Sequence, residues 1–123
     1  MPDVRVLVVD DQPAYRRALA AVVAETDGFE MVAESTSGEE SLEAADRLRP
    51  DLVLMDVNLP DIDGLEAARR MRASDSPPVV LLLSTYDEDA GEGFVAESGA
   101  AGYVTKSAFG PDRLAAAWSS AVS

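Results

Sequence analysis

The amino-acid sequence predicts an α/β fold in which five parallel strands form a doubly wound sheet with helices on both faces. Apolar runs alternate with amphipathic segments five times along the 123 residues. Three of these runs are almost continuously apolar, which is typical of parallel strands covered on both faces. The connections are short, and crossovers of this kind are right-handed. We expect the strand order 2-1-3-4-5, with the switch point between the first and third strands.

The first half of the chain contains two strand–helix units. The run Val4–Val9 predicts the first strand, and residues 29–34 alternate as a less buried edge strand does. A capping box at residues 37–40 opens the second helix, and Pro50 ends it. The apolar stripes expected to face the core are Tyr15, Ala18, Leu19, Val22 and Val23 in the first helix and Leu42, Ala45 and Leu48 in the second.

The second half contains three more units. Strands are predicted at 52–55, 79–83 and 101–104, and an irregular loop at 58–64 precedes a helix that begins near Leu65. The fourth helix follows an acidic turn at 87–89 and contains Gly91 and Gly93, each costing about 0.5–1 kcal/mol relative to alanine. We therefore expect this helix to be marginal and mobile. The last helix starts at Pro111, and its apolar stripe is Leu114, Ala117, Trp118, Ala121 and Val122. We interpret Trp118 as core packing rather than as an interface anchor.

The composition limits the available chemistry. The chain is long enough for one domain with its own core. It contains no cysteine and no histidine, which excludes thiolate catalysis, Ser-His-Asp hydrolysis and metal sites built on either residue. A metal would therefore be bound by oxygen, which favours Mg²⁺, Ca²⁺ or Mn²⁺.

The charge limits the partners. The formal net charge of −13 repels nucleic acid and anionic membranes. No apolar run approaches the roughly 20 residues that a membrane span needs. The start, Met-Pro-Asp, leads directly into a strand and shows no secretory signal. We expect a cytoplasmic domain that binds neither DNA nor a membrane by itself.

Five polar residues stand where predicted strands end. Because the carboxyl ends of parallel strands meet at one edge of a sheet, these side chains should converge there. The chain has one lysine beside nine arginines, and that lysine belongs to the set. The five residues are the carboxylates Asp10, Asp11 and Asp56, the hydroxyl Ser84 and the ammonium Lys106.

Such a set suits a divalent cation and a phosphoryl group. Crowded carboxylates repel one another, and a bound Mg²⁺ removes that penalty while leaving a position for a phosphoryl oxygen. Lys106 and Ser84 can neutralise further charge on the transferring group. Asp56, alone at the end of the central strand, is the best candidate nucleophile for an aspartyl phosphate. Asp11 is expected to bind the metal directly, and Asp10 through water.

Each residue also has a purely structural interpretation. Asp10 and Asp11 alone are more often a turn with an N-cap aspartate. Ser84 could cap the next helix, Asp56 could be a turn residue, and Lys106 could be a solvated surface lysine. The functional interpretation depends on their shared position at strand ends.

Six short motifs together form a specific pattern: Val8–Asp11, Pro50–Asp56, Asn58–Pro60, Asp63–Gly64, Leu83–Thr85 and Gly99–Lys106. With these motifs the chain resembles a receiver domain of two-component response regulators over essentially its whole length, 1–123. The resemblance extends to the NarL/FixJ subfamily, whose receivers usually precede a LuxR-type helix-turn-helix output domain. It implies a flavodoxin-like (βα)5 fold.

The resemblance implies a role for each site residue. Asp56 accepts a phosphoryl group from a sensor histidine kinase or a small phosphodonor such as acetyl phosphate. Asp10, Asp11, Asp56 and the Asn58 backbone carbonyl hold Mg²⁺, with Mn²⁺ as an alternative. Ser84 and Lys106 bond phosphoryl oxygens, and Ser84 and Tyr103 act as switch residues. Asn58 and Tyr86 tune the lifetime of the phosphorylated form.

It also implies an output. Phosphorylation switches the surface formed by the fourth helix, the fifth strand and the fifth helix, and it can promote a homodimer. DNA would be bound only by an output domain, which we expect to follow this chain in a longer transcription regulator. Such a receiver is a phosphoacceptor and not a turnover enzyme on external substrates.

One departure from the family concerns the residue after Lys106. Many receivers carry proline there, linked by a cis peptide, whereas this chain has Ser107. A non-proline cis bond costs about 2.5–4 kcal/mol, so the geometry stays open.

Three rival functions are weaker. A degenerate receiver, acting as an interaction module without phosphorylation, is disfavoured because all five positions hold competent residues. A haloacid-dehalogenase-type phosphatase needs Asp-x-Asp after its first strand, and Gln12 breaks that spacing. A flavodoxin-like cofactor binder would need a phosphate loop rich in Ser, Thr or Gly, and this loop is acidic.

Overall fold

The computed structural model describes residues 3–123, so the first two residues of the Met-Pro-Asp start lie outside it. Within that range five strands and five α-helices alternate along the chain. The strands form one sheet in the order β2-β1-β3-β4-β5, and all neighbours are parallel. The predicted fold class and strand order are both confirmed.

The element bounds follow the predicted pattern closely. The last predicted strand began one residue too early, because Gly102 is the first residue to pair with β4, opposite Leu81. The strands are β1 Val4–Val9, β2 Phe29–Ser35, β3 Leu52–Asp56, β4 Val79–Ser84 and β5 Gly102–Thr105. The helices are α1 Pro13–Glu25, α2 Gly38–Leu48, α3 Gly64–Arg72, α4 Glu88–Ser98 and α5 Pro111–Val122, with a short 3-10 turn at Lys106–Ala108 between β5 and α5.

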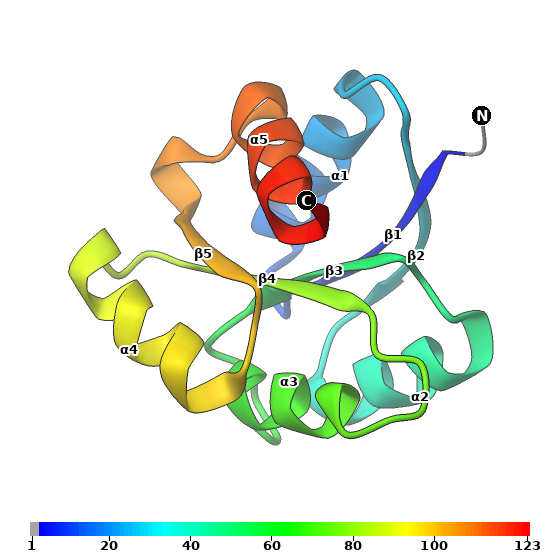
Figure 1. The fold of residues 1–123 in the computed structure, drawn as a ribbon, viewed down its shortest axis with the longest axis vertical. Helices are drawn as coiled ribbons and strands as arrows, with labels where there is room; N and C mark the ends of the chain where they lie inside the picture. Colours follow the sequence, from blue (N-terminus) through cyan, green and yellow to red (C-terminus); the bar gives the residue numbers. More distant parts are fainter. Residues whose placement is uncertain (1–2) are drawn as a thin grey trace.

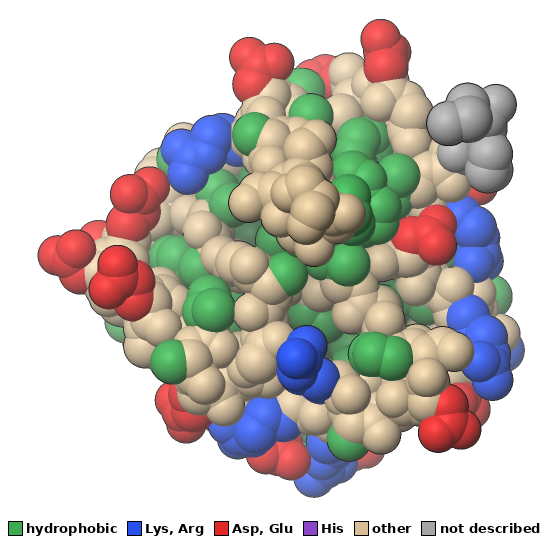
Figure 2. Space-filling view, viewed as in Figure 1, with side chains coloured by type: hydrophobic (Ala, Val, Ile, Leu, Met, Phe, Trp, Pro, Cys, Tyr) green, Lys and Arg blue, Asp and Glu red, His purple; other side chains and the backbone are tan. Residues whose placement is uncertain are grey.

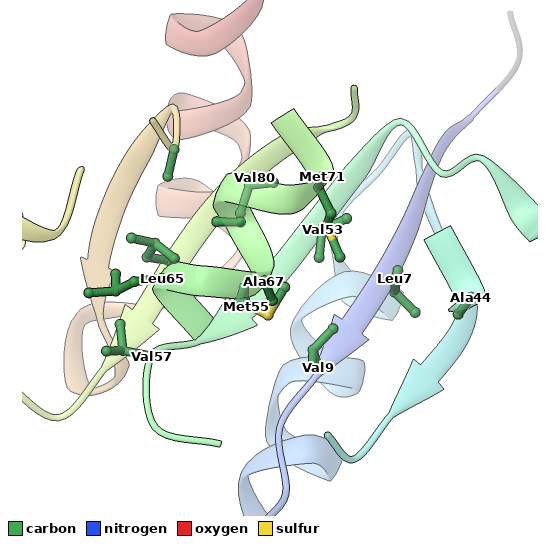
Figure 3. Close-up of a cluster of buried hydrophobic side chains, with 13 residues drawn as sticks. Leu7, Val9, Ala44, Val53, Met55, Val57, Leu65, Ala67, Met71 and Val80 are labelled. Carbon is green, nitrogen blue, oxygen red and sulfur yellow. The ribbon is translucent and has the colours of Figure 1, made fainter. Parts of the chain in front are cut away.

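The molecule has three layers. Figure 1 shows α1 and α5 on one face of the sheet and α2, α3 and α4 on the other. Successive side chains of a strand point to opposite faces, so each central strand supplies both interiors. In β1, Leu7 and Val9 join the cluster under α2 and α3 (Figure 3), whereas Val6 and Val8 join the cluster under α1 and α5. Burial on both faces is why these strands are almost continuously apolar.

Fewer of the apolar residues of helix α1 are buried than their spacing predicts. Leu19 and Val23 are buried and Val22 is half-buried, as predicted, but Ala18 is exposed and Tyr15 is 36% exposed. Tyr15 lies in the first turn, where α1 reaches the carboxyl edge of the sheet and lines the cleft described below. Its ring therefore has a different environment from the core.

Helices α2 and α5 also differ in detail from the predicted stripes. In α2 the buried side chains are Ser41 and Ala44, while the predicted Leu42, Ala45 and Leu48 are half-buried. The Ser41 hydroxyl donates to the Gly38 carbonyl at 2.6 Å, which satisfies it inside the helix. In α5 Leu114 is completely buried, Trp118 packs edge-on against Phe29, and Val122 is 52% exposed.

The helix caps follow the local sequence. Ser37 accepts from the Glu40 backbone N–H at 3.1 Å, as the capping box predicts. Asp63 and Asp87 cap α3 and α4 in the same way. None of the helices within residues 3–123 has the length and apolarity that a membrane crossing would require.

Candidate functional site

Three carboxylates meet at the carboxyl edge of the sheet. Asp10 follows β1 directly and is completely buried, Asp11 is exposed, and Asp56 is the last residue of β3 with 3% exposure. Because β1 and β3 are neighbours with Val9 opposite Met55, the next residues emerge side by side. One carboxylate oxygen from each of the three aspartates lies within 4.8 Å of the others. The structure thus brings together the three acidic residues that the strand-end pattern selected.

Lys106, the first residue of the 3-10 turn after β5, completes this cluster. Its Nζ donates to Asp10 Oδ2 at 2.8 Å and lies 3.5 Å from Asp56 Oδ2. The side chain is 7% exposed, so the surface-lysine interpretation is excluded for the described structure. The Lys106–Ser107 peptide, left open by the sequence, is trans.

The two buried carboxyl groups have unequal surroundings. Both oxygens of Asp10 accept hydrogen bonds, from the Gln12 N–H at 2.9 Å and from Lys106. The Arg16 guanidinium also donates to the Asp10 backbone carbonyl at 3.0 Å and pairs with Glu34, which fixes the turn after β1. Asp10 is therefore held in one orientation by its neighbours.

Asp56 is the electrostatically perturbed member. Burial and then the nearby Asp10 charge raise the pKa of Asp56 to about 6, although Lys106 and the Asn58 backbone N–H act in the opposite direction. The lowering of the Asp56 pKa by the single ammonium group is thus smaller than its raising by burial and by the neighbouring carboxylate. The ionised Asp56 would be stabilised by any further cation placed against it.

The donor set fits a small hard cation. Carboxylate oxygens are the ligands that Mg²⁺ and Mn²⁺ prefer. Asp11 is exposed, and within residues 3–123 its carboxylate takes part in no hydrogen bond or ion pair, so its oxygens are available to a ligand. The side chains border an open cleft of about 270 Å³, large enough for a phosphoryl group. Its lining is Asp11, Gln12, Tyr15, Asp56, Asn58, Leu59, Pro60, Thr85 and Lys106.

Ser84 and Tyr103 form a second group, and neither residue lines the cleft. Ser84 ends β4, is completely buried, and accepts from the Tyr86 backbone N–H at 3.3 Å, while Thr85 is the residue that lines the cleft. The half-buried Tyr103 donates its hydroxyl to the Tyr86 carbonyl at 2.5 Å and packs edge-on against Phe94. Burial raises the pKa of Tyr103. Both switch candidates therefore contact the segment that leads from β4 to α4.

One contact that the sequence did not predict connects the loop at residues 58–64, beside the cleft, to α2. Asp61 accepts the Gly38 and Glu39 backbone N–H groups at 2.8 and 2.9 Å, so its carboxylate sits at the N-terminus of α2. The Glu39 N–H in particular holds the pKa of Asp61 below its usual range. This link fastens the loop that carries Asn58. It joins residues more than twenty positions apart, and no local pattern could have identified it.

Comparison with known proteins agrees with this geometry. Residues 6–119 match the family described as the response regulator receiver domain. The response regulator GacA of Pseudomonas viridiflava is 44% identical over 105 residues, covering 85% of this chain and 49% of GacA. The transcriptional regulatory protein DegU of Brevibacillus brevis is 32% identical, covering 84% of this chain and 44% of DegU. The chain thus spans about half the length of these curated relatives.

Solved structures agree as well. The signal receiver domain of the response regulator NarL from Mycobacterium tuberculosis superposes with a TM-score of 0.86 at 30% identity, and 98% of each chain is covered. A LuxR-family two-component response regulator from Aurantimonas superposes with a TM-score of 0.84 at 32% identity, covering 95% of this chain and 83% of that one. With the strand order and the acidic cluster, these matches show that the chain belongs to the family of response regulator receiver domains.

Proposed function

We propose that this domain accepts a phosphoryl group on Asp56 in a reaction that depends on Mg²⁺. The donor would be a sensor histidine kinase or a small phosphodonor such as acetyl phosphate. The observation that carries the proposal is the position of Asp56, which lines an open cleft, lies 3.5 Å from the Lys106 ammonium and lies beside the other two aspartates.

Each site residue has a part in the transfer. An Asp56 carboxylate oxygen forms the new bond to phosphorus, and the bond to the donor's leaving nitrogen or oxygen breaks with its electron pair on the donor. Asp11, Asp56 and the Asn58 backbone carbonyl would hold Mg²⁺, with Asp10 acting through water; the metal supplies charge neutralisation. The Lys106 ammonium lies close enough to Asp56 to donate a hydrogen bond to a phosphoryl oxygen attached there. The domain itself remains a phosphoacceptor rather than a turnover enzyme.

The response would pass through β4 and β5. A new acceptor on Asp56 draws the Ser84 hydroxyl toward it, and Tyr103 follows because both contact the Tyr86 backbone. Phosphorylation would thus bias two arrangements of the surface formed by α4, β5 and α5. Asn58 and Tyr86 flank the site and would tune the phosphoryl lifetime.

The relatives support a proposal for the longer protein. We infer a cytoplasmic regulator in which residues 1–123 are the receiver and a C-terminal helix-turn-helix domain binds DNA. The transcriptional regulatory protein DegU and the LuxR-family structure support this output. A homodimer formed on phosphorylation is the accompanying expectation.

The direct test is phosphorylation by acetyl phosphate with Mg²⁺, followed by intact mass. The wild-type protein should gain one phosphoryl group, and Asp56→Ala should gain none while keeping its fold. Asp46→Ala, which removes an exposed carboxylate on α2, is the matched control and should be labelled like the wild type. Undiminished labelling of Asp56→Ala would remove the nucleophile assignment. An unlabelled wild-type protein would favour the degenerate receiver.

A further inference from the structure

The Lys106 ammonium has a third neighbour besides the two buried carboxylates. Its Nζ lies 3.9 Å from the centre of the Tyr15 ring, over the ring face. An ammonium group has three N–H donors, and three acceptors surround this one: Asp10 at 2.8 Å, Asp56 at 3.5 Å and the Tyr15 ring. A cation held over an aromatic face in this way gains electrostatic stabilisation that grows as water is excluded.

Core packing does not account for this position of Tyr15. The ring belongs to neither apolar cluster, is 36% exposed and lines the same cleft as Asp56. It comes from the first turn of α1, whereas Lys106 stands in the short 3-10 turn that follows β5. With Tyr15 above it, the Lys106 side chain is only 7% exposed although the cleft beside it is open.

We propose that Tyr15 is a positioning residue for the phosphoryl transfer, acting through Lys106; this rests on the function proposed above. When the phosphoryl group reaches Asp56, the ammonium must exchange a carboxylate partner for a phosphoryl oxygen. The ring stays as the partner that does not change, and it keeps the ammonium from turning toward solvent or toward the exposed Asp11. Lys106 then starts each transfer close to the oxygen whose charge it must neutralise.

The contact can be tested without any phosphodonor, because Lys106 is the only lysine. Protein labelled with ¹³C and ¹⁵N lysine gives one set of lysine side-chain signals. In the wild type and in Tyr15→Phe, the ring current should shift the Lys106 Cε protons upfield. In Tyr15→Leu they should return to the position of an ordinary lysine, and Tyr86→Leu should leave them shifted. The same signal position in all four proteins would overturn the contact.

The positioning role needs a kinetic comparison. With acetyl phosphate and Mg²⁺, Tyr15→Leu should lower the maximal phosphorylation rate roughly five- to tenfold, with KM for acetyl phosphate little changed. Tyr15→Phe keeps the π face and should retain nearly the full rate. A loss of rate that Phe does not rescue would instead point to the hydroxyl group and would overturn this assignment.

Two further outcomes separate this inference from the proposed function. The fluorescence of Trp118, the only tryptophan, reports whether each variant is folded. If the wild type is phosphorylated and folded Tyr15→Leu is phosphorylated as fast, the role of Tyr15 is overturned and the function stands. If the wild type is not phosphorylated at all, the proposed function fails together with the kinetic role, and the lysine signals still decide the contact.

Discussion

Asp56 is a carboxyl group that the fold buries beside a second buried carboxyl group, with one ammonium group between them. Burial dominates the balance and raises its pKa to about 6. In the protein without metal, Asp56 is therefore half protonated near pH 6, and its ionised form is held at a cost in stability. A carboxylate that is poorly solvated and poorly paired is well suited to gain from a cation or a new covalent partner.

This cost predicts how stability depends on pH in the presence of a chelator. The folded protein keeps the Asp56 proton up to a pKa of about 6, whereas the carboxyl group in the unfolded chain releases it near the ordinary aspartate pKa of 3.8. The folded state binds more protons between these values, so the free energy of unfolding contributed by Asp56 falls as pH rises through that window. The loss should reach about 2–3 kcal/mol above pH 6. Urea unfolding at several pH values measures it.

Asp56→Asn provides the comparison for that measurement. The variant cannot ionise at this position, so it should lack the downward slope between pH 4 and pH 6 and should exceed the wild type in stability at neutral pH. Asp46→Asn, at an exposed carboxylate on α2, should keep the wild-type slope. Parallel curves for the wild type and Asp56→Asn would show that the pKa of Asp56 is not raised.

At the level of single residues, the convergence of the three carboxylates and Lys106 was predictable, whereas Ser84 does not line the cleft and the partners that hold each group were not predictable. Asp10, Asp56 and Lys106 could be selected because strand ends in a parallel sheet converge. The partners Tyr15 and Asp61 could not. Tyr15 fits the apolar spacing of a helix whose first turn in fact leaves the core, and Asp61 caps a helix that is distant in the sequence. Both depend on how separate elements dock.

Among the elements, α4 shows why a glycine can be required where propensity argues against it. Gly91 is buried, and a Cβ atom there would lie 2.1 Å from Cδ2 and 2.6 Å from Cγ of the Tyr103 ring. The missing side chain therefore makes room for Tyr103 against the helix backbone. Gly93 differs, because a Cβ atom there would meet nothing within 4 Å. Of the two glycines that together predicted a marginal helix, only Gly91 is required by packing.

Alanine substitutions at these two positions should have opposite effects. Gly93→Ala removes a backbone-entropy cost without any new contact and should raise the free energy of unfolding by about 0.5–1 kcal/mol. Gly91→Ala forces Tyr103 or α4 to move and should lower it by roughly 1–3 kcal/mol. Urea unfolding of the two variants, which differ only in the position of one methyl group, measures the contrast.

A Tyr103→Ala background identifies the cause of the Gly91 effect. With the ring absent, Gly91→Ala should become neutral or stabilising, because only its helix propensity remains. This double-mutant comparison isolates the contact between the two residues. If Gly91→Ala destabilised both backgrounds equally, the Tyr103 ring would not be the reason for the glycine.

The element pattern itself was predictable to within a residue or two, for a physical reason. Strands buried on both faces, such as Leu52–Asp56, must be continuously apolar, and the proline, glycine and cap residues between them mark the turns. The face that a helix buries was less predictable. In α2, Ser41 and Ala44 face the interior because small side chains allow close packing, and the larger Leu42 lies at the margin.

Over the whole molecule, charge is distributed unevenly. Figure 2 shows acidic side chains at the left, over the end of α4, while several basic ones lie below, over α2 and α3. The basic residues there are engaged with acidic neighbours: Arg69 and Arg70 both pair with Glu66. At the cleft, by contrast, three carboxylates face one lysine, so this region keeps part of the excess negative charge that gives the chain its net charge of −13. Adding a divalent cation at that point should stabilise the entire fold.

Mg²⁺ should accordingly raise the melting temperature. A ligand that binds only the folded state adds about 1.4 kcal/mol at ten times its Kd, which corresponds to roughly 3–6 °C in Tm for a domain of this size. Asp11→Asn should melt above the wild type in a chelator, because one repelling charge is gone, and should gain less from Mg²⁺. Asp46→Asn removes an equal charge outside the cluster and should keep the full gain, which separates metal binding from a change in net charge. A wild-type melting temperature indifferent to millimolar Mg²⁺ would mean that the three carboxylates do not bind this metal.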